Sequence, residues 1–245
     1  MKVAFLGATR GMGRALARLM ASRGDRLFLL GRSLEDLARS ARDLEARAGL
    51  GSVGVAACDL ERPETFSPAL GAAEASLEGL DCVVVTAGLF ATQDALEADV
   101  DLAQRLLLVD FTNTVAFCEH ARKRLLARGG GTLCVFSSVA GERGRKPVVL
   151  YGAAKAGLSA YLEGLDHRFH AKGLRVVCVK PGFVRTSMTD GLKPPPFAGT
   201  AEDVASRVLR AIDRGTPVVY APPIWWLVMA IIRRLPRAVM RRVEF

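Results

Sequence analysis

Three residues in the second half of the chain, Ser138, Tyr151 and Lys155, have the types and spacing of a proton-transfer centre. Positions i and i+4 of a helix share one face, so the phenol of Tyr151 and the ammonium of Lys155 can act on the same small volume. A free tyrosine, with a pKa of about 10, is a poor proton donor near neutrality. A neighbouring cation favours the phenolate and lowers that pKa. The pair is therefore predicted to exchange a proton with an alcohol oxygen, to which Ser138 adds a hydrogen bond.

A glycine-rich turn at the start of the chain predicts a nucleotide site near this centre. Residues 2–8, KVAFLGA, form an apolar run that breaks at Gly7, and a helical pattern begins near Gly11. A strand, a glycine turn and a helix form the phosphate-binding arrangement of a dinucleotide fold. The spacing is G-x-x-x-G-x-G instead of the G-x-G-x-x-G fingerprint. The residues of this turn expected to contact the nucleotide are Gly7, Thr9, Arg10, Gly11, Met12 and Gly13.

The end of the second predicted strand, residues 26–31, favours NADP(H) over NAD(H). A fold that selects NAD usually places an acid near this point to bind the ribose 2′-hydroxyl. This chain has Arg32 and Ser33 there, and Arg10 in the glycine turn. Two cations without an acid suit a 2′-phosphate. Two solvated arginines, with NAD(H) as the cofactor, are the alternative interpretation.

Taken together, these residues resemble the short-chain dehydrogenase/reductase superfamily over almost the whole chain. The resemblance implies that Asp59 meets the adenine amine and that Thr86-Ala87-Gly88 matches the N-A-G motif, with Thr86 where Asn is usual. It also implies that residues 181–186, PGFVRT, hold the nicotinamide carboxamide and that Lys155 binds the nicotinamide ribose. The further cofactor contacts that it implies are Asp59, Leu60, Ala87, Gly88, Tyr151, Lys155, Pro181, Gly182, Val184 and Thr186.

One position departs from the pattern of that family. The family often completes a catalytic tetrad with Asn in the helix before the serine strand, where its backbone helps hold a proton-relay water. Here that position is Asp110, and Asn113 is out of register by three residues. We therefore expect Asp110 to keep the backbone role while its charge alters the pKa of Lys155.

A narrower resemblance covers the second half of the chain. Residues 140–145, AGERGR, with Tyr151-Gly152 and the tail from Pro222, are similar to bacterial reductases of the decaprenylphosphoryl-2-keto-ribose type. Those enzymes reduce a sugar ketone carried on a polyprenyl phosphate. The resemblance implies a small-molecule or lipid-linked carbonyl substrate. The wider family implies a homodimer or homotetramer built from the helices around 98–127 and 149–172.

Length and alternating apolar segments predict a single Rossmann-like α/β domain, residues 1–222, followed by a helical extension, residues 223–245. Half of the 245 residues are hydrophobic, which suits a doubly wound parallel sheet with helices on both faces. The seven expected strands are 2–7, 26–31, 53–57, 81–86, 132–137, 175–180 and 217–221. The expected helices are about 11–23, 33–48, 61–77, 98–127, 149–172 and 201–214, with a helical tail from about 223.

Cysteine usage and the N-terminus favour a cytoplasmic protein. The five cysteines are dispersed without a C-x-x-C pair, which argues for neither a metal site nor a disulfide framework. Four of them, Cys58, Cys82, Cys134 and Cys178, lie in apolar strand-like runs, which favours buried thiols in a reducing compartment. The apolar start is interpreted as the first strand and not as a signal peptide. Residues 193–199, which include three consecutive prolines, are predicted to edge a substrate lid or to form a rigid connector.

The tail combines an apolar segment with a cluster of arginines. Residues 224–232, IWWLVMAII, are apolar on every side, which is typical of a helix that is buried or in lipid. The segment is too short to span a bilayer, which needs about 20 residues. Five arginines follow it against the single Glu244, in a chain with a net charge of +9. Contact with an anionic membrane at the inner face and docking on the substrate cleft or a partner subunit are the two alternatives.

The sequence therefore predicts an NADP(H)-dependent oxidoreductase that interconverts a ketone and a secondary alcohol without a metal. Tyr151 is the expected general acid and base, Lys155 tunes it, Ser138 orients the carbonyl, and Asp110 completes the group. Two rivals are a non-catalytic nucleotide-binding sensor and a protein that binds membrane surfaces without turnover. Nucleic acid is not an expected partner, because no recognition motif accompanies the charge.

Overall fold

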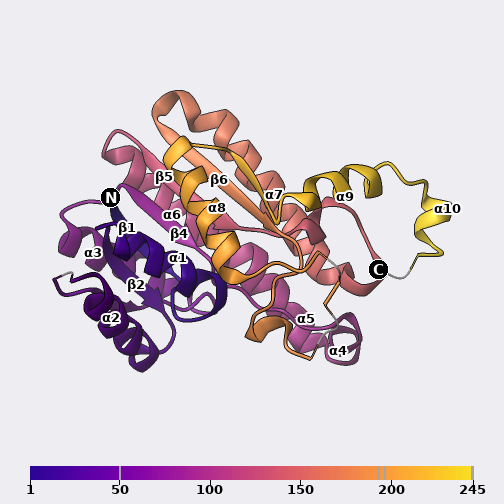
Figure 1. The fold of residues 1–245 in the computed structure, drawn as a ribbon, viewed down its shortest axis with the longest axis horizontal. Coiled ribbons are helices and arrows are strands. Elements are labelled where there is room, and N and C mark those ends of the chain that lie inside the picture. The colour runs from indigo at the N-terminus through magenta and orange to yellow at the C-terminus, as the bar shows by residue number, and fades with distance from the viewer. Residues whose placement is uncertain (50, 192–193, 196, 244–245) are drawn as a thin grey trace.

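A seven-stranded parallel sheet forms the centre of the molecule (Figure 1). The computed structural model describes residues 1–49, 51–191, 194–195 and 197–243. The strands are β1 (Lys2–Leu6), β2 (Arg26–Gly31), β3 (Gly54–Ala57), β4 (Cys82–Val85), β5 (Gly131–Phe136), β6 (Leu174–Pro181) and β7 (Val218–Ala221). Their order is β3-β2-β1-β4-β5-β6-β7, which confirms all seven predicted strands and the doubly wound sheet. The order reverses between β1 and β4, where such folds bind ligands beyond the carboxyl ends of the strands.

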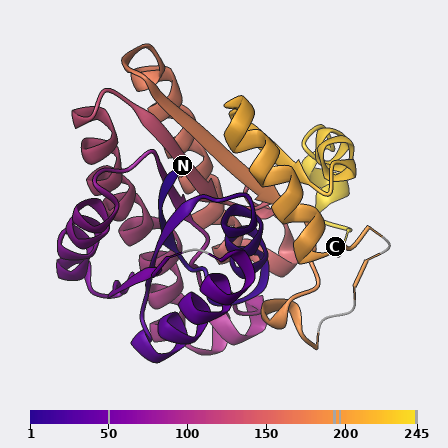
Figure 2. The ribbon, with the colours of Figure 1, turned by 60° about the vertical axis from the view of Figure 1, so that its left-hand side comes forward.

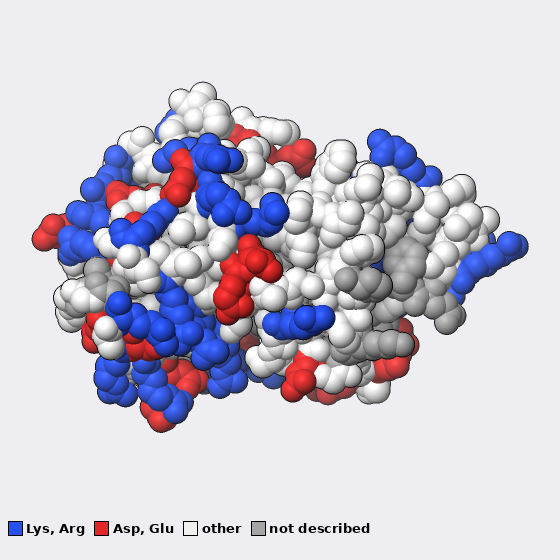
Figure 3. Space-filling view, viewed as in Figure 1, with Lys and Arg blue, Asp and Glu red and all other residues white. Residues whose placement is uncertain are grey.

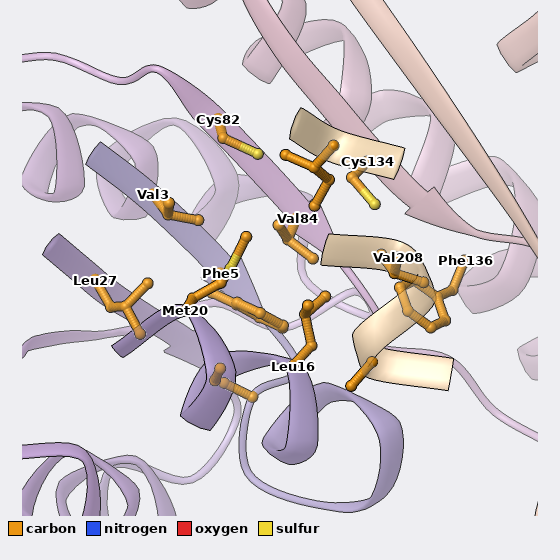
Figure 4. Packing of buried hydrophobic residues seen from close by; sticks show 14 of the residues in the cluster. Val3, Phe5, Leu16, Met20, Leu27, Cys82, Val84, Cys134, Phe136 and Val208 are labelled. Carbon is orange, nitrogen blue, oxygen red and sulfur yellow. The ribbon is translucent and has the colours of Figure 1, made fainter. Parts of the chain in front are cut away.

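Helices cover both faces of this sheet because successive strand residues point to opposite sides. The helices are α1 (Gly11–Ser22), α2 (Leu34–Ala48), α3 (Phe66–Leu77), α4 (Gln93–Ala98), α5 (Val100–Leu107), α6 (Thr114–Ala127), α7 (Val149–Phe169), α8 (Ala201–Arg214), α9 (Ile224–Ile232) and α10 (Arg237–Met240). On one face, Phe5 packs with Leu16 and Met20 of α1 and with Val208 of α8 (Figure 4). On the other face, Leu6 belongs to the core formed with α3, α6 and α7.

The helix predicted over residues 98–127 differs from the structure at its start and in its middle. A separate helix, α4, precedes it and was not predicted, and α5 begins at Val100. Between α5 and α6, Leu108–Asn113 forms a π-helical turn. Such turns widen a helix locally and are frequent at functional sites. Asp110 lies within this turn and its side chain is fully buried.

The C-terminal tail docks on the domain through one face of α9, as the docked alternative predicts in part. Met229 and Ile232 are buried in a small cluster with Val139, which follows Ser138 directly in the chain. Figures 1 and 2 show α9 and α10 at the edge of the molecule, outside the layers that cover the sheet. The opposite face of α9 is exposed, so the helix is not buried on every side.

Three further expectations bear on location and chemistry. Every cysteine is buried and unpaired, which confirms the prediction of buried thiols. Among the described helices, none has the length and hydropathy needed to cross a bilayer. Within the predicted lid edge, residues 193 and 196 lie outside the described residues.

Candidate active site

The glycine turn after β1 packs tightly against the loop after β4. A Cβ on Gly7, where φ is +98°, would lie 2.6 Å from the backbone nitrogen of Ala87. A Cβ on Gly13 would collide with the Gly7 carbonyl oxygen and the Thr86 hydroxyl. That hydroxyl donates to the Gly7 carbonyl oxygen at 2.9 Å, so Thr86 ties the two loops together. No side chain caps α1 at Arg10, which leaves the first N–H groups of the helix available to a phosphate.

A cavity of about 580 Å³ opens beside this turn along the carboxyl ends of the strands. Its size suits a small-molecule or cofactor site. The predicted cofactor contacts that line it are Gly7, Thr9, Arg10, Arg32, Ser33, Asp59, Leu60, Ala87 and Gly88. The other predicted contacts, which are not part of its described lining, are Gly11, Met12, Gly13, Tyr151, Lys155, Pro181, Gly182, Val184 and Thr186. A Cβ on Gly11 would nevertheless lie 3.4 Å from the Thr186 methyl, so the P-G-x-x-x-T segment borders the glycine turn. The close approach of bare backbone, the uncapped helix and the cavity together fit a dinucleotide.

Two carboxylates that the sequence analysis missed lie beside the arginines expected to meet a 2′-phosphate. Arg32 is 3.5 Å from Glu61, and Arg10 is 3.5 Å from Asp36. The acid of an NAD site is expected directly after the second strand, and neither residue lies there. Asp36 is in the first turn of α2, and Glu61 follows β3. Glu61 also binds Arg105 at 2.6 Å. The side chains of Arg32 and Arg10 are 66% and 73% exposed, which leaves both free to turn toward an anion.

Ser138, Tyr151, Lys155 and Asp110 meet where β5 ends and α7 begins. The Lys155 Nζ lies 3.2 Å from Asp110 Oδ2 and 5.5 Å from the centre of the Tyr151 ring. The Ser138 side chain, which accepts a hydrogen bond from the Ala140 backbone nitrogen at 3.1 Å, lies close enough to Tyr151 to lower its pKa. The side chains of Lys155 and Asp110 are 6% and 0% exposed. The structure thus brings the four predicted catalytic residues into one group.

Small and polar neighbours hold this group in place. The Ser137 hydroxyl donates to the Lys155 carbonyl oxygen at 3.0 Å, which ties the end of β5 to α7. A Cβ on Gly141 would lie 2.6 Å from the backbone of Lys155, so only glycine lets the loop after Ser138 lie on the helix. Phe90 meets the Tyr151 ring edge-on at 5.2 Å between centroids. The Tyr151 ring is therefore positioned by packing against Phe90.

Asp110 is fixed from two sides. Its Oδ1 accepts a hydrogen bond from the Leu89 backbone nitrogen at 2.6 Å, while Oδ2 faces Lys155. A Cβ on Gly88 would lie 3.0 Å from Asp110 Oδ1 and 3.5 Å from Lys155 Nζ. The backbone at Gly88 therefore packs directly against the ion pair. Asn113 has a different task, because its amide donates to the Leu60 carbonyl oxygen at 2.6 Å and anchors the loop after β3.

The electrostatics of Tyr151 differ from the expectation that Lys155 lowers its pKa. Burial raises the pKa of Tyr151, Lys155 and Ser138 lower it, and Asp110 raises it, with a net upward direction. The lysine does favour the phenolate, but the Asp110 carboxylate beside it offsets its charge. Burial lowers the pKa of Lys155, and the opposing effect of Asp110 and Tyr151 makes the net direction upward, so the lysine stays charged.

Replacing Asp110 with Asn is expected to be tolerated and to shift the alkaline limb of ketone reduction to lower pH. Asn keeps an oxygen for the Leu89 nitrogen but removes the charge that raises the pKa of Tyr151. Reduction needs the protonated phenol, so its rate falls as the pH rises through the pKa of Tyr151, and a lower pKa moves that fall downward. The measurement is the pH profile of kcat/KM at saturating cofactor.

The matched control for this prediction is Asp110→Ala, which removes both the charge and the oxygen that Leu89 donates to. We expect Ala to lower activity and the thermal unfolding midpoint more than Asn does, because the loop after β4 loses its anchor. An Asn variant with full activity and an unshifted profile would show that the carboxylate does not act on Tyr151.

Known proteins resemble this chain over most of its length. The profile of the short chain dehydrogenase family matches residues 2–195. An uncharacterized oxidoreductase of Mycobacterium tuberculosis is 34% identical over 243 residues, which cover 98% of this chain and 96% of that protein. Carbonyl reductase family member 4 of Xenopus laevis is 28% identical, with coverage of 86% and 90%. The solved structure of levodione reductase matches the fold with a TM-score of 0.80 at 22% identity, with coverage of 89% and 94%.

Proposed function

The chain belongs to the short-chain dehydrogenase/reductase family of oxidoreductases, and we propose that it interconverts a ketone and a secondary alcohol with NADP(H). The observation that carries this proposal is the enclosed group of Ser138, Tyr151, Lys155 and Asp110 next to the glycine-lined cavity. When bound, the nicotinamide cofactor supplies or accepts the hydride. The name of the carbonyl reductase relative supports a carbonyl substrate for this chain.

In the reducing direction, the side chains of the site bind and protonate the carbonyl oxygen. The Ser138 hydroxyl donates a hydrogen bond that polarises the carbonyl. Tyr151 gives its proton to the oxygen as negative charge develops there. Lys155, held by Asp110, stabilises the phenolate that remains. Oxidation uses the same groups in reverse, and the raised pKa of Tyr151 favours the protonated state that reduction needs.

Replacing Tyr151 with Phe is expected to lower turnover by roughly 10²–10⁴-fold, the usual contribution of a general acid. Cofactor affinity should change little, because the ring still packs edge-on against Phe90. The measurements are NADPH absorbance with a panel of ketones and a separate titration of cofactor binding. Near-normal turnover in the variant would contradict the mechanism. Cofactor binding without turnover of any ketone by the unaltered protein would favour the non-catalytic sensor.

Arg32 and the start of α2 support NADP(H) as the preferred cofactor. Arg32 is exposed at the end of β2, and Ser33 caps α2, whose N-terminal N–H groups favour an anion. On binding, a 2′-phosphate would compete with Glu61 for the Arg32 guanidinium. The phosphate, with its higher charge and three oxygens, is the stronger acceptor.

Replacing Arg32 with Asp is expected to shift the ratio of kcat/KM for NADP(H) and NAD(H) toward NAD(H) by about tenfold or more. The added carboxylate repels a 2′-phosphate and accepts a hydrogen bond from a 2′-hydroxyl. The control is Arg62→Asp, which makes the same charge change at an exposed arginine outside the cavity lining. An unchanged ratio in the Arg32 variant, or an equal shift in the control, would count against contact with the ribose.

The exposed face of α9 supports a further proposal, peripheral contact of this cytoplasmic enzyme with the inner face of a membrane. Trp226, Leu227 and Ile231 are 57%, 49% and 57% exposed. In Figure 3, the end of the molecule that holds α9 and α10 is largely uncharged, with basic side chains at its outer edge. An apolar helix face bordered by arginines is typical of an interfacial helix. In this view residues 1–222 form the catalytic domain and residues 223–245 an extension.

Replacing Leu227 and Ile231 with Ser is expected to abolish most binding to anionic vesicles while the fold is kept, since both side chains are exposed. Removing the whole tail is a poorer test, because it would also uncover Val139. The control is Leu34→Ser with Val218→Ser, two exposed apolar residues outside the tail and outside α5, α6 and α7. Co-sedimentation with anionic and neutral vesicles at low and high salt measures the effect, and salt should weaken it. No vesicle binding by the unaltered protein would end this proposal.

The family resemblance also supports assembly into a homodimer or homotetramer through α5, α6 and α7. Val100, Leu108 and Phe111 expose apolar surface on α5 and on the π-helical turn that follows it. Burial of such surface between subunits would stabilise an oligomer.

A further inference from the structure

A second cavity, of about 420 Å³, lies between the loop that follows Ser138 and the end of the tail. It shares no lining residue with the cavity at the glycine turn. The residues that line it are Arg143, Gly144, Lys146, Arg237, Met240 and Arg241. Cationic side chains therefore dominate its wall, and they come from two segments that are far apart in the chain.

Within the part of the chain that the structure describes, no acidic side chain pairs with Arg143, Arg237 or Arg241. Arg143 instead donates to the carbonyl oxygen of Leu235 at 3.0 Å. The acid next to it, Glu142, is already bound to Lys180 and to Arg233. Positive charges gathered around one cavity repel one another. An anion bound among them is attracted to each cation and offsets that repulsion.

The wall of this cavity is held by packed structure on both sides. Met240, which lines the cavity, also packs against the cluster that contains Met229, Ile232 and Val139. The Glu142 carboxylate, only 4% exposed, joins β6 to the end of α9 through Lys180 at 2.5 Å and Arg233 at 3.0 Å. The two segments that supply the arginines are therefore fixed on both sides of the cavity.

We propose that this cavity is a phosphate-binding site, separate from the site of the dinucleotide. Guanidinium groups bind the oxygens of a phosphate with paired hydrogen bonds, and several arginines can share one phosphate. The phosphate can belong to a lipid headgroup or to a free phosphate compound, since both present the same oxygens. The site is inferred from the cavity alone and does not depend on turnover at Tyr151.

Intrinsic fluorescence can report on this site because both tryptophans of the chain, Trp225 and Trp226, lie in α9. We would titrate the full chain with inorganic phosphate at constant ionic strength and, separately, with phosphatidylglycerol vesicles. No nucleotide is added, because the 2′-phosphate of NADP⁺ would compete for the same arginines. Dependence on Arg237 and Arg241 separates this site from the dinucleotide cavity. Equilibrium dialysis of phosphate and sedimentation with vesicles measure binding directly alongside the fluorescence.

Replacing Arg237 and Arg241 together with Ala is expected to weaken binding by at least about tenfold, because two charge-assisted contacts are lost. The double Lys variant should keep part of the affinity, since the charge remains but the paired hydrogen bonds of the guanidinium groups are lost. The control is Arg207→Ala with Arg210→Ala, which removes the same charge from the exposed face of α8. Thermal unfolding midpoints should agree among all variants, because both target arginines are exposed.

Saturable binding of inorganic phosphate that needs Arg237 and Arg241 would support a site for a free phosphate compound. Binding to the vesicles alone, with the same dependence, would support a lipid headgroup. Absence of binding to either probe would overturn the proposal, as would equal weakening in the α8 control. Because no substrate is turned over, these outcomes are independent of the proposed reaction.

Discussion

The buried ion pair between Lys155 and Asp110 is the interaction on which the arrangement of the catalytic side chains depends. Both charges are withdrawn from water, and their charged atoms lie 3.2 Å apart. A buried charge is costly unless it is paired and hydrogen-bonded, so each residue needs the other in this position. Leu89 anchors one side of the pair and Ser137 the other. The pair thereby fixes the loop after β4 in contact with α7, which is the helix that carries Tyr151.

The same pair changes what the lysine can do for the tyrosine. An isolated ammonium would favour the phenolate, but a carboxylate at 3.2 Å cancels much of its field at the phenol. Burial then dominates, and the pKa of Tyr151 rises. In the proposed reaction, a phenol that keeps its proton acts as the acid that reduction needs. In that reaction, the carboxylate at position 110, where the resembled family often has Asn, would thus favour reduction.

Features that depend on local pattern could be predicted, and features that depend on tertiary contact could not. The seven strands followed from short apolar runs, and the catalytic group from the spacing of Ser138, Tyr151 and Lys155. The π-helical turn at Asp110 has no comparable signal, because its apolar residues also fit an unbroken helix. Glu61 was missed for a related reason, since its partners are distant in the chain. The sequence left docking of α9 as one of two alternatives, because its contact with Val139 is equally distant.

A helix that is apolar on every side can be stable on this protein because its sides meet different surroundings. Met229 and Ile232 bury one side next to Val139. Trp225 lies so close to Gly182 that a Cβ there would collide with the indole, so this glycine of the P-G-x-x-x-T motif makes room for the tail. The tail thus contacts both the loop after the catalytic serine and the motif that follows β6. Removal of the tail would uncover Val139 and Gly182, which lie beside the proposed site, so the extension packs on the segments that border the site.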